Sequence, residues 1–164
     1  MKAKPKNGAS GGSYVLDDLG NTPGHLMRRC QQIAVSVFLD ECRVYELTPL
    51  QFAVLAALLK GGPEDQVRLG GSLALDRTTI SVVVKKLEGR GLVQRRASEK
   101  DRRSKLIYIT SAGEDLVSHV LPAVEAAQDR MMSPLSASER RRFVGLLRKM
   151  ADGNNEESRA PLRR

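Results

Sequence analysis

Hydrophobic residues recur every three or four positions over three long stretches of this chain, and that spacing is typical of amphipathic helices. We expect these helices over residues 23–45, over residues 111–132, and from the capping box Ser136-Ala137-Ser138-Glu139 onward. Pro122 lies inside the second stretch and predicts a kink there. The residues of the three apolar faces are Leu26, Cys30, Ile33, Val37 and Phe38; Leu116, Val117, Val120, Leu121 and Val124; and Phe143, Leu146, Leu147 and Met150. The long helices frame a middle section of shorter elements.

Two short helices are predicted at the start of this middle section. Thr48-Pro49-Leu50-Gln51 combines a threonine N-cap, a proline at the first helical position and a glutamine three residues after the cap. The helix that begins there ends at Gly61. Asp65 can cap a second helix over residues 66–72, although Gly70-Gly71 inside it is a poor helix-forming pair.

A helix over residues 77–90 follows, with Asp76 as its N-cap and Gly91 at its end. Its apolar positions recur at helical spacing and are Ile80, Val83, Val84 and Leu87. Another face is mostly polar and small, and consists of Thr78, Ser81, Val82 and Lys85. The β-prone runs 92–96 and 105–110 flank a charged turn and predict a β-hairpin. The predicted fold class is therefore mainly α with a small β-hairpin wing, a winged helix-turn-helix attached to a helical dimerisation region.

The charge distribution indicates the kind of partner. The chain has 164 residues, which favours one domain, and its 27 Lys and Arg exceed its 19 Asp and Glu by a net charge of +8. Ten of the cations but only three of the acids fall within residues 77–105, which indicates a partner of dense negative charge. Aromatic residues make up 4% of the chain and Trp is absent, which weakens the case for a surface that stacks single-stranded bases. Duplex DNA remains possible as the partner, and a solvated charged face is the alternative for this run of cations.

Several other classes of protein lack their sequence signatures here. The chain contains no GxSxG, HExxH, GxxxxGK or GxGxxG, so we expect neither an enzyme nor a bound cofactor. His25 and His119 are the only histidines and no Cys/His spacing resembles a zinc site, so we expect no metal. No apolar run reaches the roughly 20 residues of a membrane span, and the N-terminus has no signal-peptide core, so we expect a soluble, cytoplasmic protein.

The two helices over residues 66–72 and 77–90, joined by the tight turn Leu73-Ala74-Leu75, form a helix-turn-helix pattern. The major groove is about 12 Å wide and admits one helix, whose exposed face must carry hydrogen-bonding and cationic side chains of modest size. The second helix offers such a face. The basic hairpin would lie beside it as a wing, with Arg102 and Arg103 on the DNA backbone or in the minor groove.

These segments resemble the signature of the MarR family of winged helix-turn-helix regulators. The resemblance rests on Asp76-Arg77-Thr78-Thr79-Ile80-Ser81, Val84 to Leu87-Glu88, Gly91-Leu92-Val93, Asp101-Arg102-Arg103 and Ile109-Thr110-Ser111-Ala112-Gly113. It extends in helix order from about Pro23 to Met150. The pair Gly70-Gly71 departs from the family pattern, because relatives usually carry helix formers there, and this puts the rigidity of the short helix in question.

The resemblance implies a homodimer that binds a pseudo-palindromic operator in double-stranded DNA and usually represses transcription. The long apolar faces support the dimer independently, because one chain of this size cannot bury all three. The DNA contacts implied for this chain are Arg77, Thr78, Thr79, Ser81, Val82, Lys85, Lys86, Arg102 and Arg103. Asp101 would orient the neighbouring wing arginine. For Lys85, Lys86 and Arg90, ordinary helix solvation beside Glu88 is the alternative.

Many members of the family release DNA when a small aromatic carboxylate, or in some branches its coenzyme A thioester, enters a crevice between the dimer helices and the winged unit. The candidate ligand-binding residues here are His25, Arg28, Arg29, Tyr45 and Phe52. Arginine suits bidentate capture of a carboxylate or phosphate, and the aromatic rings could form a wall. Pairing of the two arginines with Asp17, Asp18 or a carboxylate of the partner chain is an equal alternative.

Two alternative functions stay open at this point. One branch of the family senses peroxides through a cysteine near the first helix, and Cys30 beside Arg28 and Arg29 could serve in that way. Cys30 also lies on the apolar stripe, where a free cysteine is more often a buried small hydrophobe. The other alternative is an architectural DNA-binding protein without sequence preference, although the polar face of residues 77–90 favours base reading.

The expected organisation is a single domain over residues 14–152 between two tails. Residues 46–110 form the winged helix-turn-helix, and residues 14–45 and 111–152 the helical dimerisation region. Residues 1–13 are predicted to be a disordered basic tail, and residues 153–164 a flexible C-terminal tail, because both lack hydrophobic periodicity.

Overall fold

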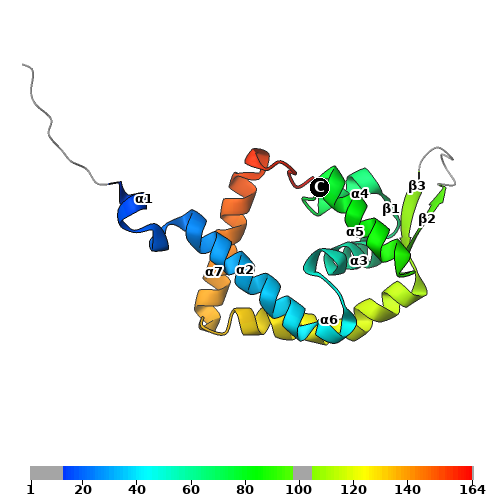
Figure 1. The fold of residues 1–164 in the computed structure, drawn as a ribbon, viewed down its shortest axis with the longest axis horizontal. Helices are drawn as coiled ribbons and strands as arrows, with labels where there is room; N and C mark the ends of the chain where they lie inside the picture. Colours follow the sequence, from blue (N-terminus) through cyan, green and yellow to red (C-terminus); the bar gives the residue numbers. More distant parts are fainter. Residues whose placement is uncertain (1–12, 98–104, 164) are drawn as a thin grey trace, which may run out of the picture.

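The computed structural model describes residues 13–97 and 105–163 (Figure 1). The predicted fold class is confirmed, since the chain is mainly helical with one small antiparallel sheet. The helices are α1 (Tyr14–Asp17), α2 (Pro23–Glu41), α3 (Pro49–Gly61), α4 (Gln66–Ser72), α5 (Arg77–Gly89), α6 (Ser111–Met131) and α7 (Ala137–Gly153). The strands are β1 (Glu64–Asp65), β2 (Val93–Ala97) and β3 (Lys105–Ile109), and 3-10 turns cover Leu19–Asn21, Arg43–Tyr45 and Asn155–Glu157.

Two reciprocal capping boxes begin helices at the predicted positions. At α3 the backbone N–H of Gln51 donates to the Thr48 hydroxyl at 3.3 Å, and the Thr48 N–H donates to Gln51 Oε1 at 2.9 Å. Ser136 and Glu139 make the same pair of bonds at the start of α7. Each box satisfies N–H groups that have no partner within the helix.

Helix α2 is shorter than its hydrophobic pattern predicts. It ends at Glu41 instead of continuing to residue 45, and Cys42 is its C-cap. The chain then makes the 3-10 turn Arg43–Tyr45, in which the Tyr45 N–H donates to the Cys42 carbonyl at 3.0 Å. Glu46 follows in the left-handed conformation with φ of 51°. This turn ends the helical register and redirects the chain into α3.

The sheet has the strand order β1-β3-β2, and all pairs are antiparallel. The predicted hairpin is present, with Val93 opposite Ile109 and Ala97 opposite Lys105. The edge strand β1 pairs Glu64 with Ile107, and sequence analysis missed it because two polar residues carry no strand pattern.

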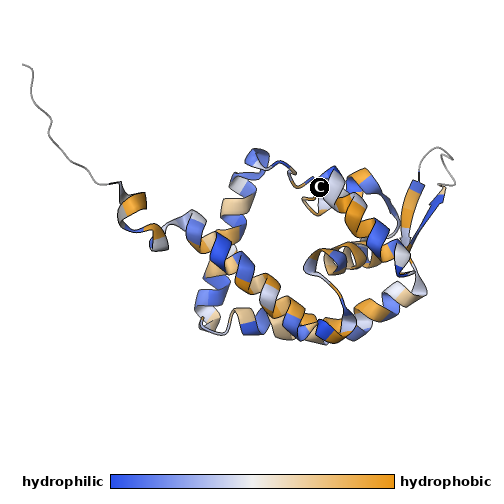
Figure 2. Cartoon of the chain, in the orientation of Figure 1, coloured by the Kyte–Doolittle hydropathy of each residue, from blue (hydrophilic) through white to orange (hydrophobic). Residues whose placement is uncertain are grey.

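The largest part of the core lies in the winged unit between α3, α5 and the sheet. Buried residues from these elements form one cluster that includes Leu55, Leu58, Val84, Leu87 and Ile107, each at most 1% exposed. Figure 2 shows hydrophobic residues along α3 and on one side of α5, where the two helices meet. This packing holds α5 with its opposite face toward solvent.

The glycine at the end of the segment Ile109 to Gly113 has a steric explanation in this fold. Gly113 is buried in the first turn of α6, where a Cβ would collide with the carbonyl oxygen of Leu92 and lie 2.8 Å from Ile109 Cγ1. Thr110 caps the helix by accepting from the Gly113 N–H at 3.1 Å. The wing and α6 therefore approach each other so closely at this point that only glycine fits.

The long helices α2 and α6 join this core through Phe38, Val117, Val120 and Val124, whereas α7 does not. Helices α2 and α6 pack side by side (Figure 1), and Arg130 of α6 donates to Asp40 at 2.5 Å and to Glu41 at 2.8 Å. The hydrogen bond from Arg130 holds the pKa of the exposed Asp40 carboxyl below its ordinary value. None of the residues of α7 is buried in the single chain.

The expectation of a flexible tail after α7 is not met in the part of the chain that the structure describes. Residues 154–163 form the 3-10 turn Asn155–Glu157 and return to α4, where the Arg163 N–H donates to the Gly71 carbonyl at 2.8 Å. Side-chain hydrogen bonds of Asn155 hold this segment in place, and hydrophobic periodicity does not detect such bonds.

Candidate nucleic-acid interface

A tight turn joins α4 to α5 and sets the angle of the second helix. The Leu75 N–H donates to the Gly70 carbonyl at 2.8 Å, and Ala74 adopts the left-handed conformation with φ of 53°. A Cβ at Gly70 would lie 3.1 Å from the Leu75 carbonyl oxygen and 3.2 Å from Ile80 Cγ2. The glycine that departs from the family pattern thus permits close packing of the turn against α5.

Helix α5 is fixed by its cap and its buried face. Asp76 accepts from the Thr79 N–H at 2.9 Å and from the Thr79 hydroxyl at 2.8 Å, and these bonds hold the pKa of Asp76 below its ordinary value. Ile80 and Val84 are buried in the core, as the apolar pattern predicts. Thr79 is half-buried, and its hydroxyl is engaged in the cap instead of facing outward.

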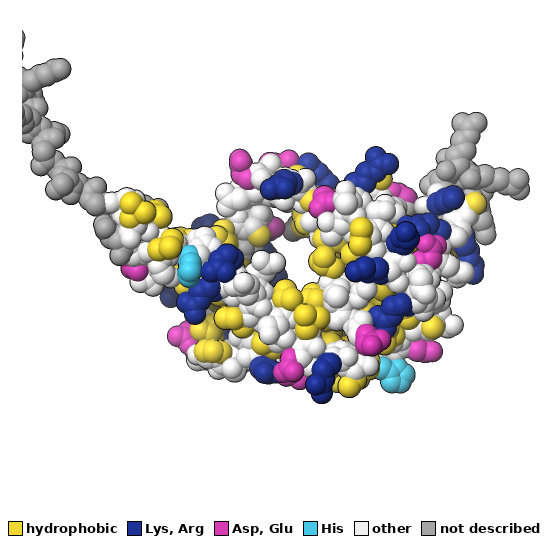
Figure 3. Space-filling model, in the orientation of Figure 1, with side chains coloured by type: hydrophobic (Ala, Val, Ile, Leu, Met, Phe, Trp, Pro, Cys, Tyr) yellow, Lys and Arg dark blue, Asp and Glu magenta, His cyan; other side chains and the backbone are white. Residues whose placement is uncertain are grey.

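The outward face of α5 carries the other predicted DNA contacts of this helix. All of them are exposed: Arg77, Thr78, Ser81, Val82, Lys85 and Lys86. Val82 is an apolar side chain at 49% exposure on a polar surface. In Figure 3, Lys and Arg side chains gather on the side of the molecule formed by α5 and the strands. The arrangement presents a slim, basic helix face of the size that a major groove accepts.

The wing packs beside α5 through an arginine that sequence analysis counted only as charge. Arg95 of β2 forms an ion pair with Glu88 of α5, and its second nitrogen donates to Gln66 Oε1 at 3.2 Å. The next residue, Arg96, lies over the Tyr108 ring at 5.4 Å from the centroid. Arg95 therefore joins the wing to both helices of the helix-turn-helix. The predicted wing residues Asp101, Arg102 and Arg103 lie outside the described residues.

Arg90 connects the end of α5 to the turn between α2 and α3. Its guanidinium donates to the Glu46 carbonyl at 2.7 Å and to the Tyr45 carbonyl at 3.1 Å. The Tyr45 hydroxyl in turn donates to the His119 carbonyl of α6 at 2.9 Å. Arg90 thus caps a backbone turn between α2 and α3, which differs from the alternative of solvation beside Glu88.

The structure does not bring the five predicted ligand-binding residues together. His25, Arg28 and Arg29 lie near the start of α2, where Arg28 donates to Gln32 at 2.7 Å. Tyr45 follows the other end of that helix, and His25 and Glu41, 16 positions apart, are separated by about 24 Å along it. Phe52 packs with its ring centroid 6.1 Å from that of Phe38 against the core.

A crevice lies between α2, α3 and α5, where a long helix meets the winged unit as the family resemblance implies, but none of the five predicted ligand-binding residues lines it. Its volume is about 670 Å³, and three elements contribute its lining. The lining residues are Gln31 and Val35 of α2; Thr48, Pro49, Leu50 and Gln51 at the start of α3; and Thr78, Thr79, Val82, Val83 and Lys86 of α5. Residues from helices far apart in the sequence line this crevice, so no local sequence pattern identifies them. It shares one wall with the helix that carries the candidate DNA contacts.

The two cysteines occupy different environments. Cys30 is exposed on α2, whereas Cys42 is fully buried, and burial raises the pKa of its thiol. A raised pKa suppresses the thiolate, so Cys42 is not a reactive thiol, and the oxidation-sensing hypothesis depends on Cys30 alone. Across residues 13–97 and 105–163, no three His, Cys, Asp or Glu side chains gather to hold a metal ion. No helix in these ranges is long and apolar enough to cross a membrane.

The fold and the DNA-facing helix agree with comparisons to known proteins. The model of the MarR family matches residues 47–105. The transcriptional repressor NicR of Pseudomonas putida is 34% identical over 143 residues, which cover 83% of this chain and 90% of NicR. The chain belongs to the MarR family. It is accordingly a DNA-binding transcriptional regulator, and the relatives that it matches are regulators, not enzymes.

Two solved structures of similar proteins extend this assignment. Bordetella bronchiseptica BpsR, whose DNA binding is regulated by 6-hydroxynicotinic acid, is 34% identical and superposes with a TM-score of 0.77 over 81% of this chain and 95% of its own. Streptomyces coelicolor PcaV, solved in complex with its natural ligand, is 33% identical with a TM-score of 0.74 over 82% of this chain and 95% of its own. MarR-type regulators of this similarity thus include proteins controlled by small molecules.

Proposed function

We propose that this MarR-family protein is a homodimeric repressor that leaves a pseudo-palindromic operator when a small aromatic carboxylate binds the crevice between α2, α3 and α5. The observation that carries the proposal is the shared wall: Thr78, Val82 and Lys86 line the crevice and also lie on the exposed side of α5. A ligand in the crevice would therefore contact the helix that reads DNA.

The lining of the crevice suits an aromatic acid. Its volume of about 670 Å³ falls within the range of roughly 300–1,000 Å³ that is typical of small-molecule sites. Val35, Pro49 and Leu50 offer an apolar surface for a ring. Lys86 is a cation among the described lining residues and would pair with the carboxylate of the ligand. Gln31 can accept a hydrogen bond from a ring substituent or donate one to it.

The relatives support this class of effector. BpsR responds to 6-hydroxynicotinic acid, an aromatic carboxylate, and NicR is a repressor. Arg28 and Arg29 form a second candidate anchor, one helical turn before Gln31 and Gln32, for a larger acidic ligand such as a thioester. The predicted DNA contacts remain Arg77, Thr78, Ser81, Val82, Lys85 and Lys86 of α5, with Arg102 and Arg103 of the wing.

The exposed apolar residues of the long helices support the homodimer. In the single chain, Ile33 of α2 is 49% exposed and Leu146 of α7 is 56% exposed. In Figure 3 hydrophobic side chains surround an opening at the centre of the chain. A second copy would remove these surfaces from water, which stabilises the assembly by roughly 25 cal/mol for each Å² of apolar surface buried.

Fluorescence anisotropy with a duplex obtained by random-sequence selection tests the proposal. Wild-type protein should bind this duplex on the order of 10³-fold tighter than a scrambled one, and 6-hydroxynicotinic acid or a related aromatic acid should weaken that binding about tenfold or more. Val35→Trp fills the crevice from α2 and should abolish the response while leaving the affinity for DNA unchanged. Val44→Trp, at a residue 79% exposed outside the crevice, is the matched control and should respond as wild type.

Three outcomes would contradict parts of the proposal. Equal affinity for both duplexes would favour the architectural alternative. A panel of aromatic acids without effect would exclude the effector class and leave the DNA-binding assignment in place. Peroxide treatment could abolish DNA binding of the wild type while Cys30→Ser keeps it. That result would replace the proposed carboxylate response with thiol oxidation at Cys30.

A further inference from the structure

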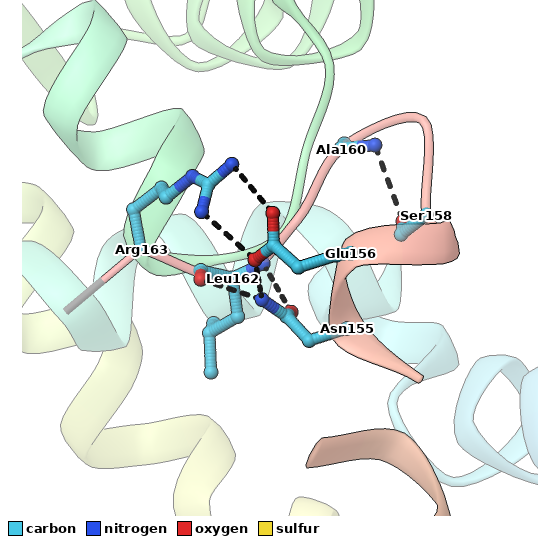
Figure 4. A network of polar contacts seen from close by, with 6 residues as sticks. All are labelled: Asn155, Glu156, Ser158, Ala160, Leu162 and Arg163. Atoms are coloured by element: carbon cyan, nitrogen blue, oxygen red, sulfur yellow. Dashed lines mark hydrogen bonds and ion pairs between the residues drawn. The ribbon is translucent and has the colours of Figure 1, made fainter. Parts of the chain in front are cut away.

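Residues 154–163, which we call the strap, leave the end of α7 and return across the molecule to the helix-turn-helix (Figures 1 and 4). The strap is held by its own hydrogen bonds. The Leu162 N–H donates to Asn155 Oδ1 at 2.7 Å, and Asn155 Nδ2 donates to the Leu162 carbonyl at 3.2 Å. The Ala160 N–H donates to the Ser158 hydroxyl at 3.1 Å. One asparagine side chain thus closes the loop.

The far end of the strap docks on α4. The Arg163 N–H donates to the Gly71 carbonyl at 2.8 Å, at the end of α4, and this carbonyl also accepts from the Ala74 N–H at 3.2 Å. The Arg163 guanidinium pairs with both carboxylate oxygens of Glu156, at 2.9 and 3.3 Å, so the arginine folds back on the strap (Figure 4).

Gly71 fits this contact sterically. A Cβ at Gly71 would lie 3.2 Å from Arg163 Cβ and 3.4 Å from Arg163 Cγ, so the arginine stem occupies the space of a side chain. Glycine is a poor helix former, and nothing within α4 itself requires it at this position. The docking of the strap therefore accounts for the second glycine of the unusual pair, as the tight turn accounts for Gly70.

The strap connects parts of the molecule that are otherwise far apart. It continues from α7, lies against α4, and encloses a hollow of about 520 Å³ whose lining includes Met27 of α2, Ala74 of the helix-turn-helix turn and Met150 of α7. Helix α7 itself has no buried residues in the single chain. The strap thus connects α7 directly to the winged unit.

We propose that the strap positions the helix-turn-helix relative to α7 and so sets the separation of the two reading helices in the dimer. This inference rests on the homodimer of the proposed function but not on its effector. A dimer reads two half-sites separated by about one helical turn of DNA, so the separation of its reading helices decides which half-site spacing it accepts. Arg163, Gly71 and Asn155 are positioning residues in this scheme and need no contact with DNA.

A double-mutant cycle tests whether the strap docks on Gly71. In a chain that ends at Gly153, Gly71→Ala should raise the thermal unfolding midpoint, because alanine is the better helix former. In the full chain the same substitution should give no increase or a decrease, because the new Cβ displaces Arg163. An equal effect in both backgrounds would overturn the docking, and this measurement is valid even if the protein is a monomer.

The consequence for DNA is tested with operators whose half-sites are moved one base pair closer or further apart. Wild type should prefer the selected spacing by about tenfold or more, and Asn155→Ala, Gly71→Ala and the chain ending at Gly153 should reduce that preference to about threefold or less. Glu157→Gln, a charge change on the strap outside the network in Figure 4, is the control and should keep the wild-type preference.

The outcomes separate the two proposals. Unchanged spacing preference in folded, dimeric strap variants would overturn the strap proposal while leaving the repressor in place. Sedimentation that shows a monomer would contradict the homodimer itself. A uniform loss of affinity for every spacing, with the ratio unchanged, would show that the strap only stabilises the fold and would also overturn its positioning role.

Discussion

The winged unit and helix α7 of this chain have similarly patterned hydrophobic residues but opposite degrees of burial. In the winged unit, Leu55, Val84 and Leu87 are fully buried within one chain. In α7, Leu146 and Met150 are 56% and 39% exposed, although they recur with the same helical spacing. Helical periodicity therefore identifies which face of a helix is apolar. It does not show whether the same chain or a second chain buries that face.

The largest expected effect comes from the core of the winged unit. Leu58→Ala should lower the free energy of unfolding by about 2–5 kcal/mol, because it leaves a cavity around a side chain that is 1% exposed. Leu59→Ala, at the next position of the same helix but 44% exposed, is the matched control and should cost far less. Urea unfolding measures both. Equal losses would remove the distinction between the two faces of α3.

The second prediction tests the exposed face of α7. Leu147 is 39% exposed in the single chain, and Leu147→Asp should raise the dimer dissociation constant about tenfold or more, because a carboxylate would replace an apolar contact at the interface. The winged unit should keep its unfolding midpoint. Lys149→Ala, on the same helix, is the control, and sedimentation equilibrium gives the constants. A dimer that tolerates Leu147→Asp would move the interface elsewhere.

The smallest expected effect concerns the cap of the reading helix at low pH. The pKa of Asp76 is lower in the folded protein than its ordinary value, because Thr79 donates two hydrogen bonds to its carboxylate. Its contribution to stability is therefore full above the unfolded pKa of about 3.9 and is lost as the pH falls through the lower folded value. Asp76→Asn keeps the acceptor for the Thr79 N–H but cannot titrate.

Thermal unfolding midpoints between neutral and acidic pH measure this effect. The variant should lose less stability than wild type on acidification, while part of the loss persists because the pKa values of Asp40 and Glu139 are also lowered. Identical acid limbs for wild type and Asp76→Asn would show that the cap does not contribute to the pH dependence.

Much of the fold was predictable from local chemistry. The capping residues Thr48, Asp76 and Ser136 begin their helices at the predicted positions, because a side-chain acceptor beside free N–H groups acts within four residues. The apolar side of α5 is buried as its spacing predicts. These features depend on neighbours in the sequence, so the sequence alone contains their cause.

The candidate site was predictable only in part. The exposed face of α5 agrees with its pattern, but Thr79 proved to belong to the cap and Arg90 to a clamp on the turn after α2. Tyr45 and Phe52 were placed in one ligand site because aromatic residues suit such sites, whereas the structure directs them to His119 and to Phe38. The role of Thr79 comes from a bond across three positions, but contacts across 14 to 74 positions of sequence decide the roles of Arg90, Tyr45 and Phe52, and no local rule contains those.

The sequence by itself determined the family, the helix starts, the basic face of α5 and the excess of apolar surface that calls for a partner, because composition and periodicity encode these directly. Only the tertiary structure decided which residues line the crevice, which arginines are paired, and why α4 tolerates Gly70-Gly71. The physical reason is that a cavity, a clamp or a close backbone approach exists only where distant segments meet, and their meeting depends on the packing of the whole chain.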